Sequence, residues 1–382
     1  MKKALFFASV ASMIDQFNLD NIVVMQKLGY KVDVACNFEF GSTTSQERVN
    51  ELKRELEKMG VNTYHIPVPR KPFLIKEMVV TYKLTKNLVE KNRYDIVHCH
   101  SPIGGAIARI ACKNSRKKGT RVIYTAHGFH FFKGSSIKNW LIYYPVEKLL
   151  ARYTDILITI NKEDYTRAKQ KFKVGSIEYI PGVGIDTTYY KNIKIDSFLK
   201  RRELGIPEDA FVLLSVGELN KNKNHEIIIR ALSKLKINNI HYVICGRGPL
   251  DAYLKQLANS FRFKDRLHLL GYRDDIGEIC KVSDVFCFPS KREGLGLAAL
   301  EAMASGLPLI TSNVHGIVDY SVDGRSGFSC RPDDIDEFAK AIKLLIENKE
   351  LRYQMGQNNI MDVKKYDIKN VDKIMHRIYS QI

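Results

Sequence analysis

Short apolar runs alternate along the chain with longer amphipathic stretches. Val- and Ile-rich runs of this length are typical of strands buried on both faces of a parallel sheet, and the stretches between them predict covering helices. The predicted strands are Ala4–Ala8, Lys31–Ala35, Thr63–Ile66, Ile96–Cys99, Val122–Thr125, Ile156–Ile160, Ile177–Ile180, Phe211–Val216, Tyr242–Cys245, Leu267–Leu269, Val285–Phe288, Leu309–Thr311 and Gly327–Ser329. The predicted helices include Glu47–Met59, Lys76–Glu90, Glu226–Leu235, Asp333–Glu347 and a terminal helix, Ile368–Tyr379.

The strand series restarts after Pro181-Gly182-Val183-Gly184, which has the composition of a turn and linker. We therefore predict an α/β protein with two doubly wound, Rossmann-like domains, residues 1–184 and 185–366, that face each other across a cleft. Residues 367–382 are expected to form a helix that packs back on the N-terminal domain. Because ligands bind beyond the carboxyl ends of parallel strands, the loops after the strands are the expected site.

Composition narrows the class of protein. The 382 residues include seven cysteines at scattered positions without metal-ligand spacing, so a disulfide scaffold is excluded and a reducing cytosol is expected. No apolar run is long enough to span a bilayer, and the N-terminal apolar run is interpreted as a strand, not a secretory signal. The net charge is +18, and residues 1–200 hold 33 basic and 18 acidic residues. Such a surface attracts nucleic acid, anionic lipid or a phosphorylated substrate, or it is simply a solvated lysine-rich surface.

The segment from Phe288 to Pro308 is the richest in candidate chemistry. It leaves a predicted strand, passes Gly294 and Gly296 and enters a predicted helix. Glycines allow close backbone approach to a ligand, and the first helical N–H groups can hold a phosphate. Glu293 and Glu301 would lie about 12 Å apart if both were helical, which is too far for the paired carboxylates of a glycosidase. Two carboxylates at different depths suit two sets of hydroxyl groups; the alternative is a helix-capping carboxylate and a surface glutamate.

This segment resembles the glutamate-x7-glutamate motif of retaining glycosyltransferases of glycosyltransferase family 4, which have the GT-B fold. The resemblance implies that Glu293 contacts the hydroxyls of the donor sugar and that Glu301 binds the ribose of the nucleotide. It also implies that backbone N–H groups of the intervening residues face the sugar and the diphosphate, namely Gly294, Leu295, Gly296 and Leu297.

The resemblance extends over nearly the whole chain. The segment from Leu214 to His225 resembles the diphosphate-binding strand and loop, with Gly217 in the turn and Lys223 as the phosphate cation. Glu218 departs from the family pattern, which usually has Arg there, and its charge would repel a diphosphate. Asn220, Lys221 or Arg247 would compensate, or Glu218 points elsewhere. Two further segments resemble donor-binding turns, Gly246-Arg247 after one strand and Tyr272-Arg273 near the nucleotide base.

In the first domain, His127 ends a predicted strand and, by the resemblance, meets the donor sugar or orients the acceptor or the leaving phosphate. The alternative is a structural histidine. His98 and His100 point the same way on their strand, but no third ligand accompanies them, so a metal site is not expected. The loop that contains Phe129, His130 and Lys133, with Trp140 after it, resembles the variant found in capsule and exopolysaccharide transferases. By this resemblance we expect the four residues to contact the acceptor or the membrane.

A membrane-facing surface is also predicted in the first domain. Residues 138–153 mix aromatic and basic side chains, and Arg116, Lys117, Lys118 and Lys133 add charge. Such a stretch suits an anionic membrane interface, although a core helix with a basic outer face is the plainer alternative.

The resemblance implies a hexosyltransferase with a UDP-sugar donor and no catalytic metal. Its expected acceptor is a polyprenyl-diphosphate-linked saccharide for cell-surface polysaccharide synthesis, and its expected location is cytoplasmic, peripheral on the inner face of the membrane. A non-catalytic nucleotide-sugar or polysaccharide-binding subunit is the alternative, suggested by Glu218. A dinucleotide oxidoreductase is disfavoured because no GxGxxG follows the first strand. A nucleic-acid-binding protein is suggested by charge alone, without a binding motif, and no nucleic-acid partner is expected.

Overall fold

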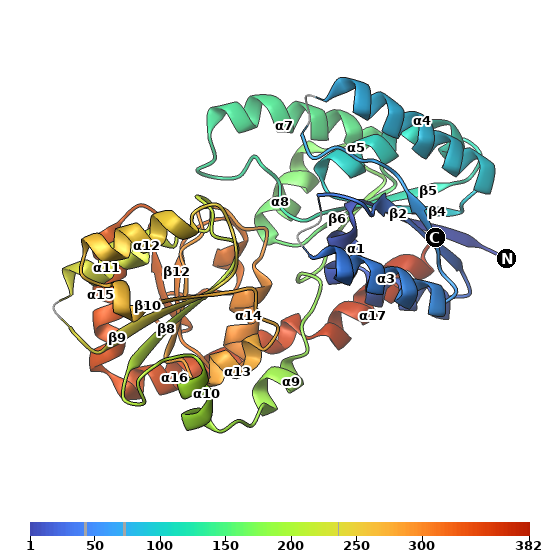
Figure 1. The fold of residues 1–382 in the computed structure, drawn as a ribbon. Coiled ribbons are helices and arrows are strands. Elements are labelled where there is room, and N and C mark those ends of the chain that lie inside the picture. The colour runs from blue at the N-terminus through green and yellow to red at the C-terminus, as the bar shows by residue number, and fades with distance from the viewer. Residues whose placement is uncertain (42–43, 72–73, 236) are drawn as a thin grey trace. The chain divides into compact units, whose positions relative to one another are not determined.

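The computed structural model describes residues 1–41, 44–71, 74–235 and 237–382. The chain divides into two compact units (Figure 1). The first unit holds Met1–Val183 and Lys369–Ile382, and the second holds Gly184–Ile368.

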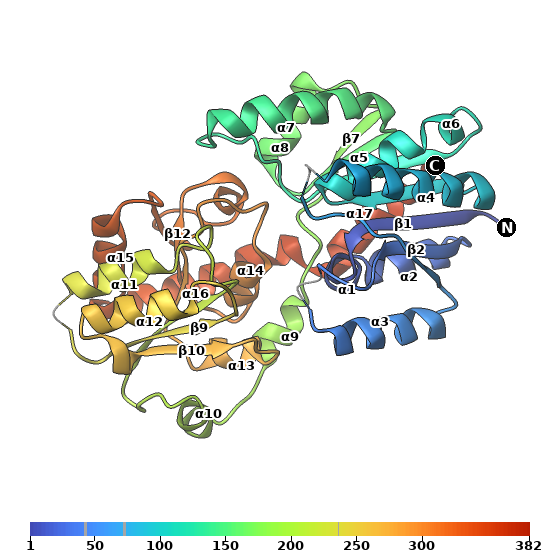
Figure 2. The same ribbon diagram turned by 45° about the horizontal axis from the view of Figure 1, so that its top comes forward.

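The first unit is built on a seven-stranded parallel sheet in the order β3-β2-β1-β4-β5-β6-β7. Helices cover both of its faces, with α4, α5 and α7 on one side and α1, α2 and α3 on the other (Figure 2). The strands are β1 (Lys3–Val10), β2 (Lys31–Asn37), β3 (Asn62–His65), β4 (Ile96–His100), β5 (Arg121–Ala126), β6 (Ile156–Thr159) and β7 (Ser176–Tyr179). The helices are α1 (Ala11–Phe17), α2 (Leu19–Lys27), α3 (Gln46–Lys58), α4 (Ile75–Asn92), α5 (Pro102–Ala111), α6 (Lys113–Arg116), α7 (Ile137–Leu150), α8 (Lys162–Lys171), the 3-10 turn η1 (Ala151–Tyr153) and the terminal α17 (Ile368–Ser380).

The second unit has a six-stranded parallel sheet in the order β10-β9-β8-β11-β12-β13. Its strands are β8 (Phe211–Val216), β9 (Ile240–Cys245), β10 (Leu267–Gly271), β11 (Val285–Phe288), β12 (Leu309–Ser312) and β13 (Gly327–Cys330). Its helices are α9 (Thr187–Asn192), α10 (Ser197–Glu203), α11 (Glu226–Lys234), α12 (Asp251–Ser260), α13 (Ile276–Lys281), α14 (Leu297–Ala304), α15 (Ile335–Glu347) and α16 (Lys349–Asp362), with 3-10 turns η2 (Lys264–Arg266), η3 (His315–Asp319) and η4 (Val363–Tyr366).

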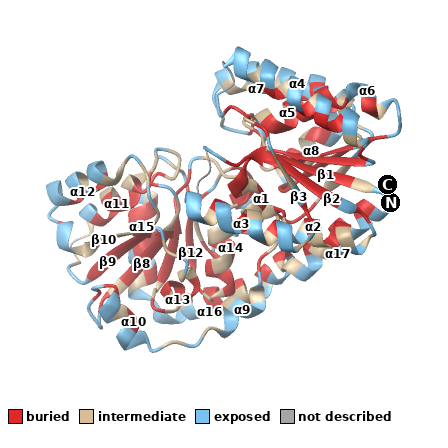
Figure 3. Cartoon of the chain, turned by 45° about the vertical axis from the view of Figure 1, so that its right-hand side comes forward, coloured by how far each residue is buried: buried red, intermediate tan, exposed pale blue. Residues whose placement is uncertain are grey.

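Burial is concentrated in the strands of both sheets and on the inner faces of the helices (Figure 3). Strand β1 shows the consequence of being covered on both faces, because every residue from Ala4 to Val10 is buried. All seven cysteines are free and buried. In the part of the chain that the structure describes, no helix has both the length and the apolar character needed to cross a bilayer.

The terminal helix α17 joins the first unit through side chains as well as through its apolar face. The Tyr379 hydroxyl lies 2.8 Å from Nδ1 of His98 on β4, and Arg377 forms an ion pair of 2.9 Å with Glu178 on β7. The amphipathic pattern predicted this helix, but its polar partners were not predictable from its own sequence.

The strands and helices predicted from periodicity are all present, with small shifts at their ends. The helix predicted to start at Asp333 begins at Ile335 instead, because the Asp334 carboxylate accepts hydrogen bonds from the N–H groups of Asp336 and Glu337. This is an N-cap, in which an acidic side chain satisfies otherwise unpaired N–H groups and opposes the positive end of the helix dipole.

Candidate active site

Loops that follow β8 and β9 touch backbone to backbone at the carboxyl edge of the second sheet. A Cβ atom added to Gly246 would lie 1.9 Å from the carbonyl oxygen of Gly217, and one added to Gly248 would lie 2.5 Å from that of Leu219. The Leu219 N–H donates to the Arg247 carbonyl at 3.0 Å. Glycine is therefore required by contact at Gly246 and Gly248, not only by turn geometry.

The loop between β11 and α14 is equally tight. Gly296 has φ +101°, and an added Cβ would lie 2.5 Å from the Phe288 ring. Gly316 packs against Gly294, where an added Cβ would lie 1.8 Å from the carbonyl oxygen. Helix α14 starts directly after Gly296 without a side-chain cap, so its first N–H groups are the ones available to an anion.

Lys223 and Glu293 form an ion pair at this edge. Lys223 Nζ lies 2.6 Å from Glu293 Oε1, and the two side chains are 21% and 15% exposed. The ammonium group also lies 4.9 Å from the centre of the Phe288 ring, and the stem of Lys223 passes Gly217, where an added Cβ would lie 3.0 Å from Cε. An ammonium group has three donors, so the geometry leaves Lys223 able to bind a further anion beside Glu293.

Glu301 lies on α14 and is held by a residue of α9. The Tyr190 hydroxyl hydrogen-bonds the Glu301 carboxylate. Gly277 packs against the same segment, because an added Cβ would lie 2.2 Å from Ile193 Cδ1 and 3.2 Å from the Tyr190 ring. Burial raises the pKa of Glu301, and the hydrogen bond from Tyr190 partly opposes that rise. Lys281 Nζ donates to the carbonyls of Lys191 (3.0 Å) and Ser305 (3.2 Å), which ties α9 to the end of α14.

The other predicted donor residues lie on the loops of the same unit. The Glu218 side chain is exposed and forms no ion pair among the described residues. Arg247 is exposed, and its Nε would lie 3.7 Å from a Cβ added to Gly271, beside the Tyr272 segment. Tyr272 is 63% exposed, whereas Arg273 is occupied by ion pairs with Glu203 (2.6 Å) and Asp275 (2.5 Å). The guanidinium of Arg273 therefore already pairs with two carboxylates of its own unit.

His127 belongs to a cluster of aromatic rings in the first unit. His100 Nδ1 lies 3.2 Å from His127 Nε2, and the Phe17 ring centre lies 5.4 Å from that of His127. Burial lowers the pKa of His127 to about 4 and that of His98 to about 3, so both rings are neutral near pH 7. No grouping of three or more metal-ligating side chains occurs among the described residues.

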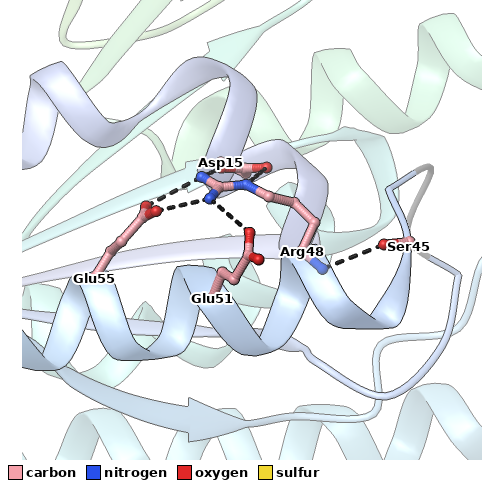
Figure 4. Close-up of polar contacts among 5 residues, drawn as sticks. All are labelled: Asp15, Ser45, Arg48, Glu51 and Glu55. Atoms are coloured by element: carbon pink, nitrogen blue, oxygen red, sulfur yellow. Dashed lines mark hydrogen bonds and ion pairs between the residues drawn. The ribbon is translucent and has the colours of Figure 1, made fainter. Parts of the chain in front are cut away.

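Helix α1, which carries Phe17, is fixed to α3 by charge (Figure 4). Arg48 binds Asp15 in a bidentate pair of 2.6 and 3.1 Å and Glu55 at 2.7 Å, and the Ser45 side chain caps α3 at the N–H of Arg48. Hydrogen bonds to Asp15 and Glu55 raise the pKa of Arg48. The pair anchors the helix that places Phe17 against His127.

Of the residues predicted to meet the acceptor or a membrane, some are packed or ion-paired within the first unit and others are exposed. Phe129 is buried, and its N–H donates to Asp164 at 2.8 Å. Trp140 packs against the core of the first unit, and the His130 ring stacks on Tyr143 at 4.5 Å. Arg116 is bound to Asp155 at 2.7 and 2.9 Å, whereas Lys117, Lys118 and Lys133 are exposed.

Three residues that contact predicted site residues were not predicted as neighbours from the sequence. Tyr190 lies far from Glu301 in sequence, and Phe17 and His100 meet His127 only through the fold. His100 had a usable signal, since it ends the strand next to that of His127 and points to the same edge.

The chain also matches known proteins along its length. Residues 22–189 match the profile described as "Glycosyltransferase Family 4", and residues 196–361 match "Glycosyl transferases group 1". The chain is 37% identical to the protein described as "Putative glycosyltransferase EpsD" of Bacillus subtilis (strain 168), over 99% of this chain and 96% of the length of that protein. The UDP-Gal:alpha-D-GlcNAc-diphosphoundecaprenol alpha-1,3-galactosyltransferase of Escherichia coli is 36% identical over 82% of this chain and 83% of its own. The crystal structure of Anabaena Alr3699/HepE in complex with UDP and glucose superposes with a TM-score of 0.80 at 20% identity, covering 100% of both chains.

The chain therefore belongs to glycosyltransferase family 4, and its two parallel-sheet units have the GT-B fold. The predicted fold class and the predicted enzyme class, a glycosyltransferase, are both confirmed.

Proposed function

We propose that this glycosyltransferase moves a sugar, with retention of anomeric configuration, from a UDP-sugar to a lipid-linked saccharide in cell-surface polysaccharide synthesis. The observation that carries the proposal is the Lys223–Glu293 pair beside the first N–H groups of α14. It combines a cation, a carboxylate and a helix N-terminus, which are the groups that a diphosphate and sugar hydroxyls need.

The proposed roles follow from this chemistry. Lys223 and the N–H groups at Leu297 and its neighbours neutralise the charge that develops on the leaving diphosphate, so no metal cofactor is required. Glu293 accepts hydrogen bonds from the sugar hydroxyls, and Glu301 does the same for the ribose. No side-chain nucleophile is assigned. The acceptor hydroxyl attacks the anomeric carbon on the face from which the diphosphate departs, and its proton passes to the departing diphosphate oxygen.

The donor and acceptor classes are supported by relatives. The Escherichia coli relative is named for a UDP-Gal donor and a GlcNAc-diphosphoundecaprenol acceptor, and the Anabaena structure holds UDP. The basic composition of the first unit favours an acceptor that carries a diphosphate.

The proposal is tested by transfer from labelled UDP-glucose, UDP-galactose and UDP-N-acetylglucosamine to a polyprenyl-diphosphate-linked sugar, without added metal. Glu293→Gln should lower turnover about 100-fold, because a carboxylate that binds the sugar in the transition state is lost. Glu347→Gln, an exposed carboxylate on α15, is the matched control and should leave turnover unchanged. Wild-type turnover in Glu293→Gln would contradict the proposal.

A second candidate, a non-catalytic nucleotide-sugar-binding subunit, is favoured by one observation. Glu218 is exposed on the diphosphate loop, at a position where its charge opposes an anionic ligand. Nucleotide binding without release of UDP from any donor and acceptor pair would favour this candidate over the enzyme.

A peripheral position on the inner face of the cell membrane is part of the proposal. Helix α7 exposes Ile137 (77%), Leu141 (72%) and Leu149 (55%), and Lys138 and Lys148 are exposed on the same helix. Spacings of four and eight residues put the three apolar side chains on one side of the helix. An exposed helix face that carries both apolar side chains and lysines suits an anionic lipid surface.

Vesicle sedimentation tests this surface. The double variant Ile137→Ser/Leu141→Ser should lose binding to vesicles that contain anionic lipid, and neutralising Lys117 and Lys118 should weaken it, as should salt. Leu344→Ser on α15 is the control, since this leucine is 38% exposed in the second unit. Equal binding by all variants would remove the membrane from the proposal.

A further inference from the structure

The ring of His127 is held by two residues of its own unit. His100, at the end of β4, forms a ring-to-ring hydrogen bond with His127, with 3.2 Å between Nδ1 of His100 and Nε2 of His127. Phe17, on the anchored helix α1 (Figure 4), packs against the same ring at 5.4 Å between centres. The orientation of the His127 ring is therefore set by the fold.

The direction of this hydrogen bond follows from the surroundings of His100. When two neutral imidazoles share a hydrogen bond, one nitrogen carries the proton and the other offers its lone pair. His100 Nε2 is buried and has no hydrogen-bond partner among the described residues. If His127 donated, the proton of His100 would sit on this nitrogen and form a buried N–H without an acceptor. Because buried unpaired N–H groups are rarer than unpaired acceptors, His100 donates from Nδ1.

The remaining member of the cluster does not compete for His127. His98 has both ring nitrogens bonded to hydroxyl groups, Nδ1 to Tyr379 and Nε2 to Thr125, each at 2.8 Å. Hydroxyls adapt to either tautomer, so His98 imposes no direction on its neighbours.

We infer that His100 is a positioning residue that holds neutral His127 in the tautomer with its proton on Nδ1. In that tautomer the Nε2 lone pair is used by His100, and Nδ1–H is the only ring donor. His127 then donates a hydrogen bond to an oxygen of a bound substrate and does not act as a general base. The oxygen belongs to a sugar hydroxyl or a phosphate, which share acceptor chemistry. The substrate contact rests on the proposed function, whereas the tautomer does not.

The experiment is nitrogen NMR of the full chain labelled with 15N-histidine at pH 7. His127 is assigned among the ten histidines by the signals lost in His127→Gln. Protonated and bare ring nitrogens differ widely in chemical shift, so the tautomer is read directly. His100→Phe removes the donor but keeps a ring, His100→Asn keeps a donor near the Nδ1 position, and His98→Phe is the matched control for damage to the cluster.

The inference predicts that the wild-type protein carries the His127 proton on Nδ1 and that His98→Phe leaves it there. His100→Phe should move it toward Nε2 and lower kcat five- to tenfold, with His100→Asn restoring part of both. A wild-type proton on Nε2, or an unchanged tautomer in His100→Phe, would overturn the inference.

Ligands separate the tautomer from the function. A shift of the His127 Nδ1 signal with UDP alone supports a phosphate contact, and a shift only with UDP-glucose or UDP-galactose supports a sugar hydroxyl. No shift with any of them, or a moved tautomer with wild-type kcat, would overturn the substrate contact of His127 while leaving the tautomer supported.

Discussion

The strands of the two sheets end in different chemistry. In the first unit, β4 and β5 end beside His100 and His127, whose rings are held neutral by burial and bonded to one another. In the second unit, the loops after β8 and β11 carry an ion pair, Lys223 and Glu293, on a backbone packed glycine against carbonyl. The first arrangement supplies hydrogen bonds of fixed direction, and the second supplies charge. The same order of strands thus carries a pair of neutral rings at the edge of one sheet and an ion pair at the edge of the other.

The largest effect should come from removing the charge of the second unit. Lys223→Met should lower kcat about 100-fold, because a preorganised cation at a leaving group contributes roughly 3 kcal/mol. His127→Gln, which removes a neutral donor, should cost about tenfold. Lys255→Met on α12 is the control, since Lys255 pairs with Asp251 on the surface of the same helix. An equal fall of kcat in Lys223→Met and His127→Gln would contradict the expectation that the charged group contributes more than the neutral donor.

The glycine packing of the second unit should be visible in stability. Gly296→Ala should lower the free energy of unfolding by about 2–3 kcal/mol more than Gly119→Ala does. Both positions have nearly the same φ, +101° and +106°, but an added Cβ at Gly119 meets nothing within 4 Å. The difference between the two variants in urea unfolding isolates the clash with Phe288. Similar losses would mean that backbone conformation, not contact, explains the glycine.

The buried carboxylate of Glu301 should strengthen UDP binding and lower the stability of the fold at pH 7. Glu301→Gln should weaken UDP binding about tenfold, because hydrogen bonds from hydroxyls to a charged acceptor are lost. Burial raises the pKa of Glu301 in the folded protein, so the folded state binds its proton more tightly than the unfolded state and loses stability as pH rises through that range. Glu301→Gln should therefore raise Tm at pH 7 and have little effect near pH 4.

The partner of Glu301 sharpens this test. Tyr190→Phe removes the hydrogen bond that lowers the pKa of Glu301, so the pKa should rise. As the pH is lowered, Glu301 should then be protonated earlier, and UDP affinity should begin to fall at a higher pH than in the wild type. Calorimetry between pH 5 and 8 measures both curves. Identical pH profiles would show that Tyr190 does not tune the carboxylate.

The smallest effect is expected at Glu218. Glu218→Gln should tighten UDP binding about threefold at low salt, because an exposed like charge near the diphosphate is removed, and the gain should shrink at high salt. Weaker binding in the variant would mean that Glu218 contacts the ligand through a hydrogen bond.

The sequence predicted the strand series and the loops that carry Lys223 and Glu293, because periodicity and glycine spacing are local signals. Their ion pair joins residues seventy positions apart and became visible only in the fold. Tyr190 was missed for the same reason, since nothing near it in sequence points to Glu301. Trp140 and Phe129 were assigned to the acceptor or the membrane through the resemblance of their segment to capsule and exopolysaccharide transferases. Aromatic residues suit both a core and a binding surface, and only the packing separates the two.

We propose that the loops at the carboxyl edge of the second sheet bind the diphosphate of a UDP-sugar. Calorimetric titration of the full chain with UDP, GDP and ADP, without added metal, tests it most directly when repeated on Lys223→Met. We expect selective binding of UDP by the wild type and its loss in the variant. Equal binding of UDP by both proteins, or no binding of any nucleotide by the wild type, would contradict it.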